Sequence, residues 1–209
     1  MKVVGSYTFD ASPQAVWDGL QDPEILAATM PGCDKLELVG ENEYEGILNI
    51  RVGPVQGKFQ GKIRLEDVDP PNGYTMVVDG KGAPGFVNAT AVVSIVAEGD
   101  GATGGDSGKT RLDYDGDARV GGRIASVGQR LLDSSSKAII KQSLEGLNEN
   151  LKARAAVGDG SEAPLIETPS QADFATKVAK EVAKDLVPKP VLIAVVVAVI
   201  LLILFLVLR

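Results

Sequence analysis

The sequence predicts an α+β fold in which a curved antiparallel sheet surrounds one long helix, and it predicts a transmembrane helix after this domain. Three features lead to this prediction. Residues 33–118 alternate apolar and polar side chains with the period of two that half-buried strands require. Residues 123–154 carry a broad apolar stripe at helical spacing. Residues 191–208 contain no polar side chain at all.

The N-terminal region predicts one strand followed by two short helices. The strand is expected over residues 2–9. Ser12-Pro13 suits the start of the first helix, because serine caps the free N–H groups and proline loses no hydrogen bond at the first helical position. Asp22-Pro23 predicts a second start, and Pro31-Gly32 predicts the end of that second helix.

About six antiparallel strands are predicted to follow. The clearest is 55–65, where odd positions are apolar or glycine and even positions are polar. Gly57 and Gly61 fall on its apolar face, where a missing side chain favours bending or leaves space above the sheet. A turn is expected at 70–73. The other strands with clear alternation are expected at 43–51, 74–81, 86–97 and 110–118, with a glycine-rich hairpin loop at 98–108.

The segment 123–154 is predicted to be one continuous helix that covers the apolar face of the sheet. Ser134, Ser135 and Ser136 interrupt its apolar stripe. Two interpretations stand. The hydroxyls bond back to the helix or face solvent, or they face a cavity and meet the polar head of a ligand.

The C-terminal region predicts a membrane anchor. The apolar run 191–208 would form a helix of about 27 Å, close to the hydrocarbon thickness of a bilayer. The alternative is a buried core helix, but core helices keep a polar face and this run has none. We expect a folded domain over 1–155, a flexible linker over 156–170 and a tail anchor over 188–209. The intervening 171–187 is expected to be an amphipathic juxtamembrane helix or a solvated spacer.

The charges beside the anchor predict its orientation. Four lysines precede the apolar run, whereas only Arg209 follows it, and an excess of lysine marks the cytoplasmic side of a span. The N-terminus lacks an apolar stretch of signal-peptide length. The single Cys33 cannot form an internal disulfide. We therefore expect a single-pass protein of the cell membrane whose folded domain is cytoplasmic.

Composition argues against several functions. The formal net charge of −7 argues against a nucleic-acid partner. The chain has no histidine and one cysteine, so it lacks the ligands of the common zinc and iron sites and the bases of Ser-His-Asp and Cys-His systems. Carboxylates, lysines and tyrosines remain for acid–base chemistry, and nearly every carboxylate falls on an outward strand position. We expect no metal and no covalent cofactor.

Several motifs occur in order along the domain: Met30-Pro31-Gly32-Cys33, Val52-Gly53-Pro54-Val55 with Gly57-Lys58-Phe59, Asp69-Pro70-Pro71, and Val120-Gly121-Gly122-Arg123-Ile124-Ala125 with Gly128. With them, residues 1–150 resemble the CoxG family of carbon monoxide dehydrogenase subunits, within the START-like (SRPBCC) superfamily. The resemblance implies a helix-grip (START/Bet v 1-like) fold, association with a molybdenum-containing carbon monoxide dehydrogenase, and delivery of that enzyme to the membrane. The chain departs from the family at Leu144 and Leu147, where members often carry aromatic residues.

The resemblance also suggests a ligand. Relatives with this architecture carry hydrophobic molecules, quinones and sterols among them, and the dehydrogenase must pass electrons to a quinone in the lipid. We hypothesise that the domain takes an isoprenoid quinone, menaquinone or ubiquinone, from the lipid bilayer and presents it to the dehydrogenase. The predicted cavity residues, each of which is alternatively ordinary core packing, are Trp17, Leu20, Met30, Phe59, Ile63, Met76, Val78, Phe86, Ala91, Tyr114, Val127, Leu131 and Ser135.

Three further alternatives stay open. Tyr114 or Tyr44 bonds a quinone carbonyl, or satisfies a backbone group. The acidic row Asp113, Asp115 and Asp117 is a solvated strand face or a docking surface for the dehydrogenase. The protein is a carrier, a membrane scaffold without a ligand, or an aromatase/cyclase-type enzyme, which would need a buried carboxylate with a raised pKa.

Overall fold

The structure is a computed structural model, and it describes residues 1–98, 108–157 and 165. Its first strand is followed by two short helices, six further strands, a 3-10 turn and a long helix, which is the predicted order. The bounds are β1 Lys2–Phe9, α1 Pro13–Gln21, α2 Pro23–Thr29, β2 Cys33–Gly40, β3 Glu43–Val52, β4 Val55–Asp69, β5 Gly73–Gly82, β6 Gly85–Glu98, β7 Lys109–Gly121, η1 Arg123–Val127 and α3 Gln129–Val157.

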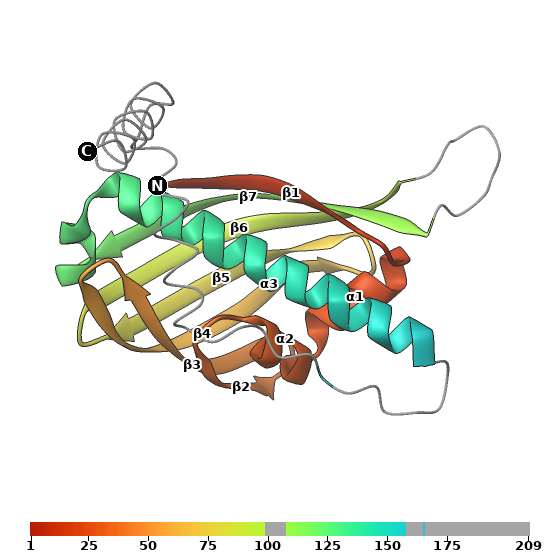
Figure 1. Ribbon diagram of the computed structural model, residues 1–209, viewed down its shortest axis with the longest axis horizontal. Helices are drawn as coiled ribbons and strands as arrows, with labels where there is room; N and C mark the ends of the chain where they lie inside the picture. Colours follow the sequence, from red (N-terminus) through yellow and green to blue (C-terminus); the bar gives the residue numbers. More distant parts are fainter. Residues whose placement is uncertain (99–107, 158–164, 166–209) are drawn as a thin grey trace, which may run out of the picture.

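The strands of the described residues form one antiparallel sheet in the order β1-β7-β6-β5-β4-β3-β2. The first strand pairs with the last, from Lys2 opposite Asp117 to Phe9 opposite Thr110. The sheet curves around α3, which lies across one face, and α1 and α2 lie near the end where α3 finishes (Figure 1). The prediction of an α+β fold with a large antiparallel sheet and a C-terminal helix is confirmed.

Alternation along the strands sets the two faces of the sheet. In β4 the side chains of Phe59 and Leu65 are buried, whereas those of Lys58 and Lys62 are exposed. As far as Leu65, odd residues of β4 therefore face α3 and even residues face solvent, as the sequence predicts. We call these the inner and the outer face of the sheet. The register shifts after Glu66, and beyond this point Val68 packs against the core.

Both short helices begin at the predicted residues. Ser12 is the N-cap of α1, where its hydroxyl oxygen accepts a hydrogen bond from the Ala15 N–H at 3.3 Å. Asp22 is the N-cap of α2 and accepts from the N–H groups of Glu24 and Ile25, at 2.9 and 3.2 Å. These caps satisfy N–H groups that the first turn of a helix leaves free, so they fix where each helix starts.

The predicted continuous helix over 123–154 is wrong at its start. Residues 123–127 form the 3-10 turn η1, and Gly128 follows with a φ of 94° before α3 begins at Gln129. A positive φ favours glycine and breaks the helical path. The Ile124 N–H donates to the Pro84 carbonyl at 2.9 Å, which ties η1 to the turn between β5 and β6. At the other end α3 continues to Val157, so Ala156 and Val157, which the sequence assigns to the linker, belong to the helix.

The apolar core is divided into two clusters. The first lies at the end of the domain that α1 and α2 cover, and it includes Trp17, Tyr74 and Leu147. The second gathers around η1 and the first turn of α3, and it consists of the buried residues Val52, Phe59, Ile124 and Leu132 with half-buried neighbours. The long helix connects the two clusters.

Several predicted segments lie outside the described residues. These are most of the glycine-rich loop 98–108, the linker 156–170 except Ala156, Val157 and Leu165, the segment 171–187 and the anchor 188–209. Among the helices of the described ranges, none has the length and apolar character needed to cross a membrane.

Candidate functional site

A row of three glycines crosses the middle of the inner face. Gly46 of β3 is the register partner of Gly61 of β4, and Gly61 is the partner of Gly80 of β5. A Cβ atom placed on Gly61 would have its nearest neighbour, the Asp79 carbonyl oxygen, at 3.8 Å. On Gly80 the nearest would be the Val87 carbonyl oxygen, at 3.6 Å. Gly61 and Gly80 therefore leave room between the sheet and α3, where side chains ordinarily pack.

Small side chains extend this region towards β6. Val78 is the register partner of Ala89, and in the next row Met76 is the partner of Ala91. All four are only half-buried although they face α3. Val78, Ala89 and Ala91 belong to neither core cluster. The close packing of a protein interior is thus interrupted between the two clusters, and we call this stretch the unfilled region.

The part of α3 that passes over the unfilled region carries three polar groups without partners. Leu132 belongs to the second cluster and Leu147 to the first, so residues 135–143 cross from one cluster to the other. Ser135 is 2% exposed and Gln142 is 7% exposed. Ser135 Oγ, Gln142 Nε2 and Ser143 Oγ are buried atoms without a hydrogen-bond partner in the described part of the chain.

The other fully buried polar side chains of the described residues are hydrogen bonded within the chain, although one further buried atom, Gln21 Nε2, also lacks a partner. Thr29 Oγ1 donates to the Leu26 carbonyl at 3.3 Å, Thr110 Oγ1 to the Ala11 carbonyl at 2.6 Å and Asn150 Nδ2 to the Gly146 carbonyl at 2.9 Å, and Asn148 Oδ1 accepts from the Asp10 N–H at 2.9 Å. Buried polar groups usually have a partner. The three unpaired groups of α3 are therefore exceptions to this rule, and the one other exception among the described residues is Gln21 Nε2 at the end of α1.

The three serines of the run 134–136 differ in their hydrogen bonding: two bond back to the helix, and one has no partner. The hydroxyls of Ser134 and Ser136 donate to the carbonyls of Arg130 and Leu132, both at 2.9 Å. This back-bonding is the first interpretation. Ser135 makes no such bond and is buried on the face of α3 that covers the sheet.

A family model for the CoxG subunit of carbon monoxide dehydrogenase matches residues 5–152. The chain belongs to this family. A solved structure of a conserved protein from Geobacillus kaustophilus is 34% identical to this CoxG-family chain, with a TM-score of 0.66. The match covers 73% of this chain and 95% of that protein, so nearly all of that solved chain corresponds to the domain described above. No similar protein was found among functionally curated proteins.

More distant structures show the fold. The Zhui aromatase/cyclase from Streptomyces sp. R1128 is 16% identical with a TM-score of 0.52, and the match covers 76% of this chain and 98% of that one. A START superfamily protein from Mycobacterium smegmatis is 16% identical with a TM-score of 0.52, covering 72% and 98%. The CoxG-family domain thus has a START-like fold, and the resemblance stated from its motifs is confirmed.

Most of the thirteen predicted cavity residues lie at one or other cluster. The first cluster and its border contain Trp17, Leu20, Met30, Ile63, Met76 and Tyr114. The second cluster and its border contain Phe59, Val127 and Leu131. The unfilled region between them contains Val78, Ala91 and Ser135.

The register corrects the predicted inward placement of Phe86. Phe86 pairs with Gly121 on the outer face of β6, where it is 43% exposed and its ring lies over that glycine. Inward residues of β6 are at odd positions, such as the buried Val93. Gly57 lies on the inner face as predicted, but of its two predicted roles it does not leave space, because a Cβ there would overlap the ring of Pro84.

The two candidate tyrosines have different surroundings. The Tyr44 hydroxyl donates to Gln21 Oε1 at 3.0 Å and lies 3.2 Å from the Gln21 carbonyl oxygen, so it already has partners. The ring of Tyr114 lies over its register partner Gly5, where a Cβ would overlap the hydroxyl. Burial raises the pKa of both phenols, so both stay protonated at neutral pH.

Two residues of the candidate site, Gln142 and Ser143, are not among the predicted cavity residues. The signal that points to them is spacing, since they follow Ser135 by seven and eight positions. Residues seven or eight apart share one face of a helix. Because Ser135 is predicted to face the cavity, its helical spacing to Gln142 and Ser143 could have identified these two residues from the sequence.

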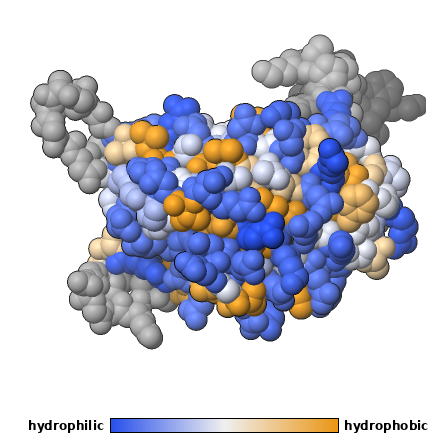
Figure 2. Space-filling view, turned by 180° about the vertical axis from the view of Figure 1, so that it is seen from behind, coloured by the Kyte–Doolittle hydropathy of each residue, from blue (hydrophilic) through white to orange (hydrophobic). Residues whose placement is uncertain are grey.

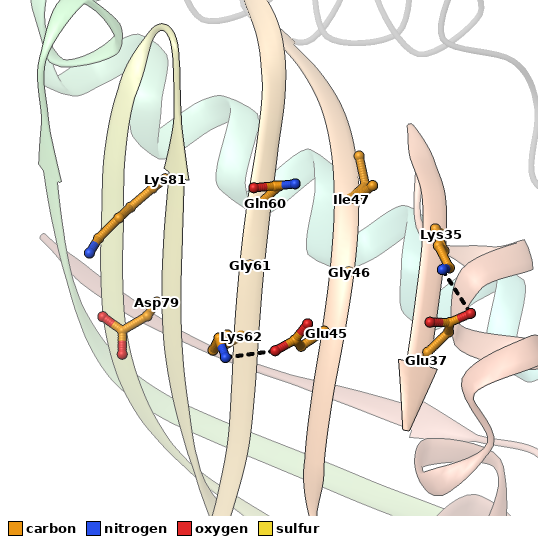
Figure 3. A pocket seen from close by; sticks show the side chains of 10 residues that line it. All are labelled: Lys35, Glu37, Glu45, Gly46, Ile47, Gln60, Gly61, Lys62, Asp79 and Lys81. Carbon is orange, nitrogen blue, oxygen red and sulfur yellow. Dashed lines mark ion pairs between the residues drawn. The ribbon is translucent and has the colours of Figure 1, made fainter. Parts of the chain in front are cut away.

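A second hollow, on the outer face, differs in character. It has a volume of about 370 Å³ and is lined by charged and polar side chains that point away from α3 (Figure 3). Lys62 pairs with Glu45 at 2.6 Å and Lys35 with Glu37 at 2.9 Å. The face of the molecule seen from behind is mostly hydrophilic, with separate apolar patches (Figure 2). The lining of this hollow also includes Ile47, Gly46 and Gly61, so ion pairs make up only part of it.

The acidic row of β7 is partly neutralised by neighbouring cations. Lys2 Nζ lies 3.1 Å from carboxylate oxygens of both Asp115 and Asp117, and Arg111 Nη2 lies 2.8 Å from Asp113 Oδ1. All of these side chains are well exposed, so the pairs contribute little to stability. The row is a solvated strand face in this structure.

Proposed function

We propose that this CoxG-family protein is a membrane-anchored carrier that binds an isoprenoid quinone, menaquinone or ubiquinone, and presents it to a cytoplasmic carbon monoxide dehydrogenase. The observation that carries the proposal is the unfilled region between the two core clusters. On the sheet, this region is formed by apolar side chains and by glycines. On α3, the segment that crosses it carries buried polar groups without hydrogen-bond partners. Sites for hydrophobic small molecules usually have this composition, mostly apolar with a few polar groups.

The chemistry of the proposed partner requires an electron acceptor. The family description names carbon monoxide dehydrogenase, and we propose a molybdenum-containing enzyme of that kind as the partner. Oxidation of carbon monoxide by water yields carbon dioxide, two protons and two electrons. A quinone that takes up both electrons and both protons becomes the hydroquinone. The carrier supplies binding and transport, and the redox step belongs to the dehydrogenase.

The C-terminal sequence supports a role at the bilayer. The apolar run 191–208 would anchor the chain, and the polar stretch 156–170 would connect that anchor to the domain as a flexible linker. The lysines before the run would place the domain on the cytoplasmic side. A lipid-soluble quinone and a soluble enzyme would then be within reach of one tethered domain.

The structure favours a carrier over a scaffold or a catalyst. A scaffold has no use for an unfilled region, because side chains that filled it would stabilise the domain. A catalyst of the aromatase/cyclase kind needs an acid or base at the ligand. The buried polar side chains of the described residues are threonine, serine, glutamine and asparagine, none of which titrates near neutral pH.

The test is purification of residues 1–157 without detergent from a host that makes quinone, followed by solvent extraction, mass spectrometry and ultraviolet absorption. The carrier proposal predicts about one isoprenoid quinone per domain. An extract without quinone, from a domain that also fails to take up added quinone, would overturn the proposal and leave the membrane scaffold.

A further inference from the structure

We propose that Ser135, Gln142 and Ser143 form a polar subsite for the uncharged, oxygen-bearing head of the ligand. This inference rests on the proposed function, because it assigns one part of the same site. The three groups are the buried atoms of α3 that lack hydrogen-bond partners among the described residues. The subsite therefore has a composition and a position that can be tested separately from the question of whether a ligand binds.

The three side chains share one face of α3. Ser135 and Gln142 are separated by nearly two helical turns, about 10 Å along the axis, and Ser143 follows at once. Ile139, midway between them on this face, is half-buried. A ligand ring that lies along the helix can thus meet a polar group at each end and an apolar side chain in the middle.

Unpaired burial of these groups weakens the ligand-free domain. A buried hydroxyl or amide without a partner loses its bonds to water and gains none in return. Gly61 and Gly80 on the inner face leave room for a molecule that restores those bonds. Leucine at position 142 or alanine at position 135 would remove this cost of burying an unpaired polar group. The presence of polar side chains at these positions is explained if a ligand supplies the hydrogen-bond partner.

The donors of the subsite define the chemistry of the head. Gln142 Nε2 can only donate, so it requires an acceptor such as a carbonyl oxygen. The hydroxyls of Ser135 and Ser143 can donate or accept, since each has one hydrogen and two lone pairs. The same pocket can therefore hold a quinone carbonyl or a hydroquinone hydroxyl, which a carrier that serves a redox enzyme requires.

The subsite also selects against charged heads. None of its three groups is a cation, and no lysine or arginine is among the buried residues of the described chain. A carboxylate or phosphate placed there would be buried without a counter-charge, which costs far more than burying a ketone. Fatty acids and phospholipids should therefore bind more weakly than a neutral ring with carbonyl groups.

The experiment compares residues 1–157 as wild type with Ser135→Ala and Gln142→Leu variants. Three radiolabelled probes are followed through rapid gel filtration: a short-chain menaquinone, squalene as an isoprenoid without oxygen, and palmitate. Each variant is expected to lose about three- to tenfold in menaquinone affinity, the usual effect of one neutral hydrogen bond, and to bind squalene as the wild type does. Ser134→Ala and Ser136→Ala are matched controls, since those hydroxyls bond back to α3, and they should leave both affinities unchanged.

A second readout separates a ligand-binding role from a structural one. The ligand-free variants at positions 135 and 142 should melt at the wild-type temperature or above it, because a buried unpaired group is removed. The subsite is overturned if the wild type binds menaquinone and both variants bind it equally well, or if palmitate binds as tightly as menaquinone. A lower melting temperature with equal loss of menaquinone and squalene would also overturn it. Failure of the wild type itself to bind menaquinone would instead overturn the proposed function.

Discussion

Gly61 and Gly80 are register partners on β4 and β5, and neither presents a side chain to the helix that covers them. Several other glycines of the sheet are required by close contacts, as at Gly82, where a Cβ would overlap the Lys58 carbonyl oxygen. At Gly61 and Gly80 the nearest atoms lie at ordinary contact distances of 3.8 and 3.6 Å. Packing does not require glycine at these two positions. Their effect is to leave space between the sheet and α3.

Filling that space should block ligand uptake without damaging the fold. Gly61→Val and Gly80→Val place a β-branched residue, favoured in strands, where a Cβ meets no obstacle. We expect the melting temperature to stay level or rise. Menaquinone uptake should fall about tenfold or more, because the ligand loses the burial of apolar surface worth a few kcal/mol.

The matched control is Gly57→Val, which should lower the melting temperature because its Cβ would overlap Pro84. Thermal melts and the gel-filtration assay give both readouts. Unchanged uptake by a stable Gly61→Val protein would contradict the location of the site.

Tyr44 should act in structure and not in ligand binding. Its hydroxyl donates to Gln21 Oε1 at 3.0 Å, so Tyr44→Phe removes a bond and leaves the buried amide of Gln21 with one partner fewer. We expect the free energy of unfolding to fall by about 1–2 kcal/mol, with menaquinone affinity unchanged. Chemical denaturation and the binding assay measure the two effects. A loss of affinity without a loss of stability would return Tyr44 to the ligand site.

Phe86 and Phe59 should respond differently to the same truncation. Phe59 is a buried member of the second cluster, so Phe59→Ala should cost about 3–5 kcal/mol. Phe86 is 43% exposed on the outer face, so Phe86→Ala should cost about 1 kcal/mol or less and leave menaquinone uptake as it is. Urea titration of both variants checks the contrast. A stable Phe86→Ala protein that no longer takes up menaquinone would restore its predicted role in the cavity.

Acid should weaken the attachment of α3 to the end of β1. Lys152 Nζ lies 2.9 Å from Asp10 Oδ2, and hydrogen bonds from Lys152 and Asn148 lower the pKa of Asp10 below its ordinary value of 3.8. A lowered pKa in the folded state means that the stabilisation is complete above about pH 4 to 5 and is lost as the pH falls through the folded value.

The measurement is the difference in melting temperature between wild type and Asp10→Asn from pH 7 to pH 2.5. The difference should be largest at pH 7 and should shrink steadily in acid. A difference that is the same at every pH would contradict the assigned role of Asp10.

The strands and caps were predictable because local chemistry determines them. The alternation in 55–65 assigned the residues of β4 as far as Leu65 to a face, and Ser12 and Asp22 marked the helix starts. The break at Gly128 was not predicted, since a positive φ at a glycine depends on how η1 docks against Pro84. Local pattern also places Phe86 on the outer face, because it lies one residue out of step with Ala89 and Ala91.

The candidate site was only partly predictable. Inward positions follow from period two, but whether a glycine there makes space or a tight contact depends on the residue opposite, as Gly57 and Gly61 show. Which serine of the run 134–136 faces the sheet depends on the rotation of α3 about its axis, and no local signal sets that rotation. Ser135 is buried on the side of α3 that covers the sheet, as its place among the predicted cavity residues requires. The hydrogen bonds of Ser134 and Ser136 to the carbonyls of α3 could be assigned only in the structure.

The most direct test of the account is extraction of quinone from a bilayer. Residues 1–157 are mixed with phospholipid vesicles that contain menaquinone, the vesicles are sedimented, and the quinone in the supernatant is measured against protein concentration. A carrier predicts soluble quinone that rises with protein towards one molecule per domain, and that falls when Gly61→Val protein is used instead. Quinone that stays with the vesicles at every concentration of folded wild-type protein would contradict the carrier function.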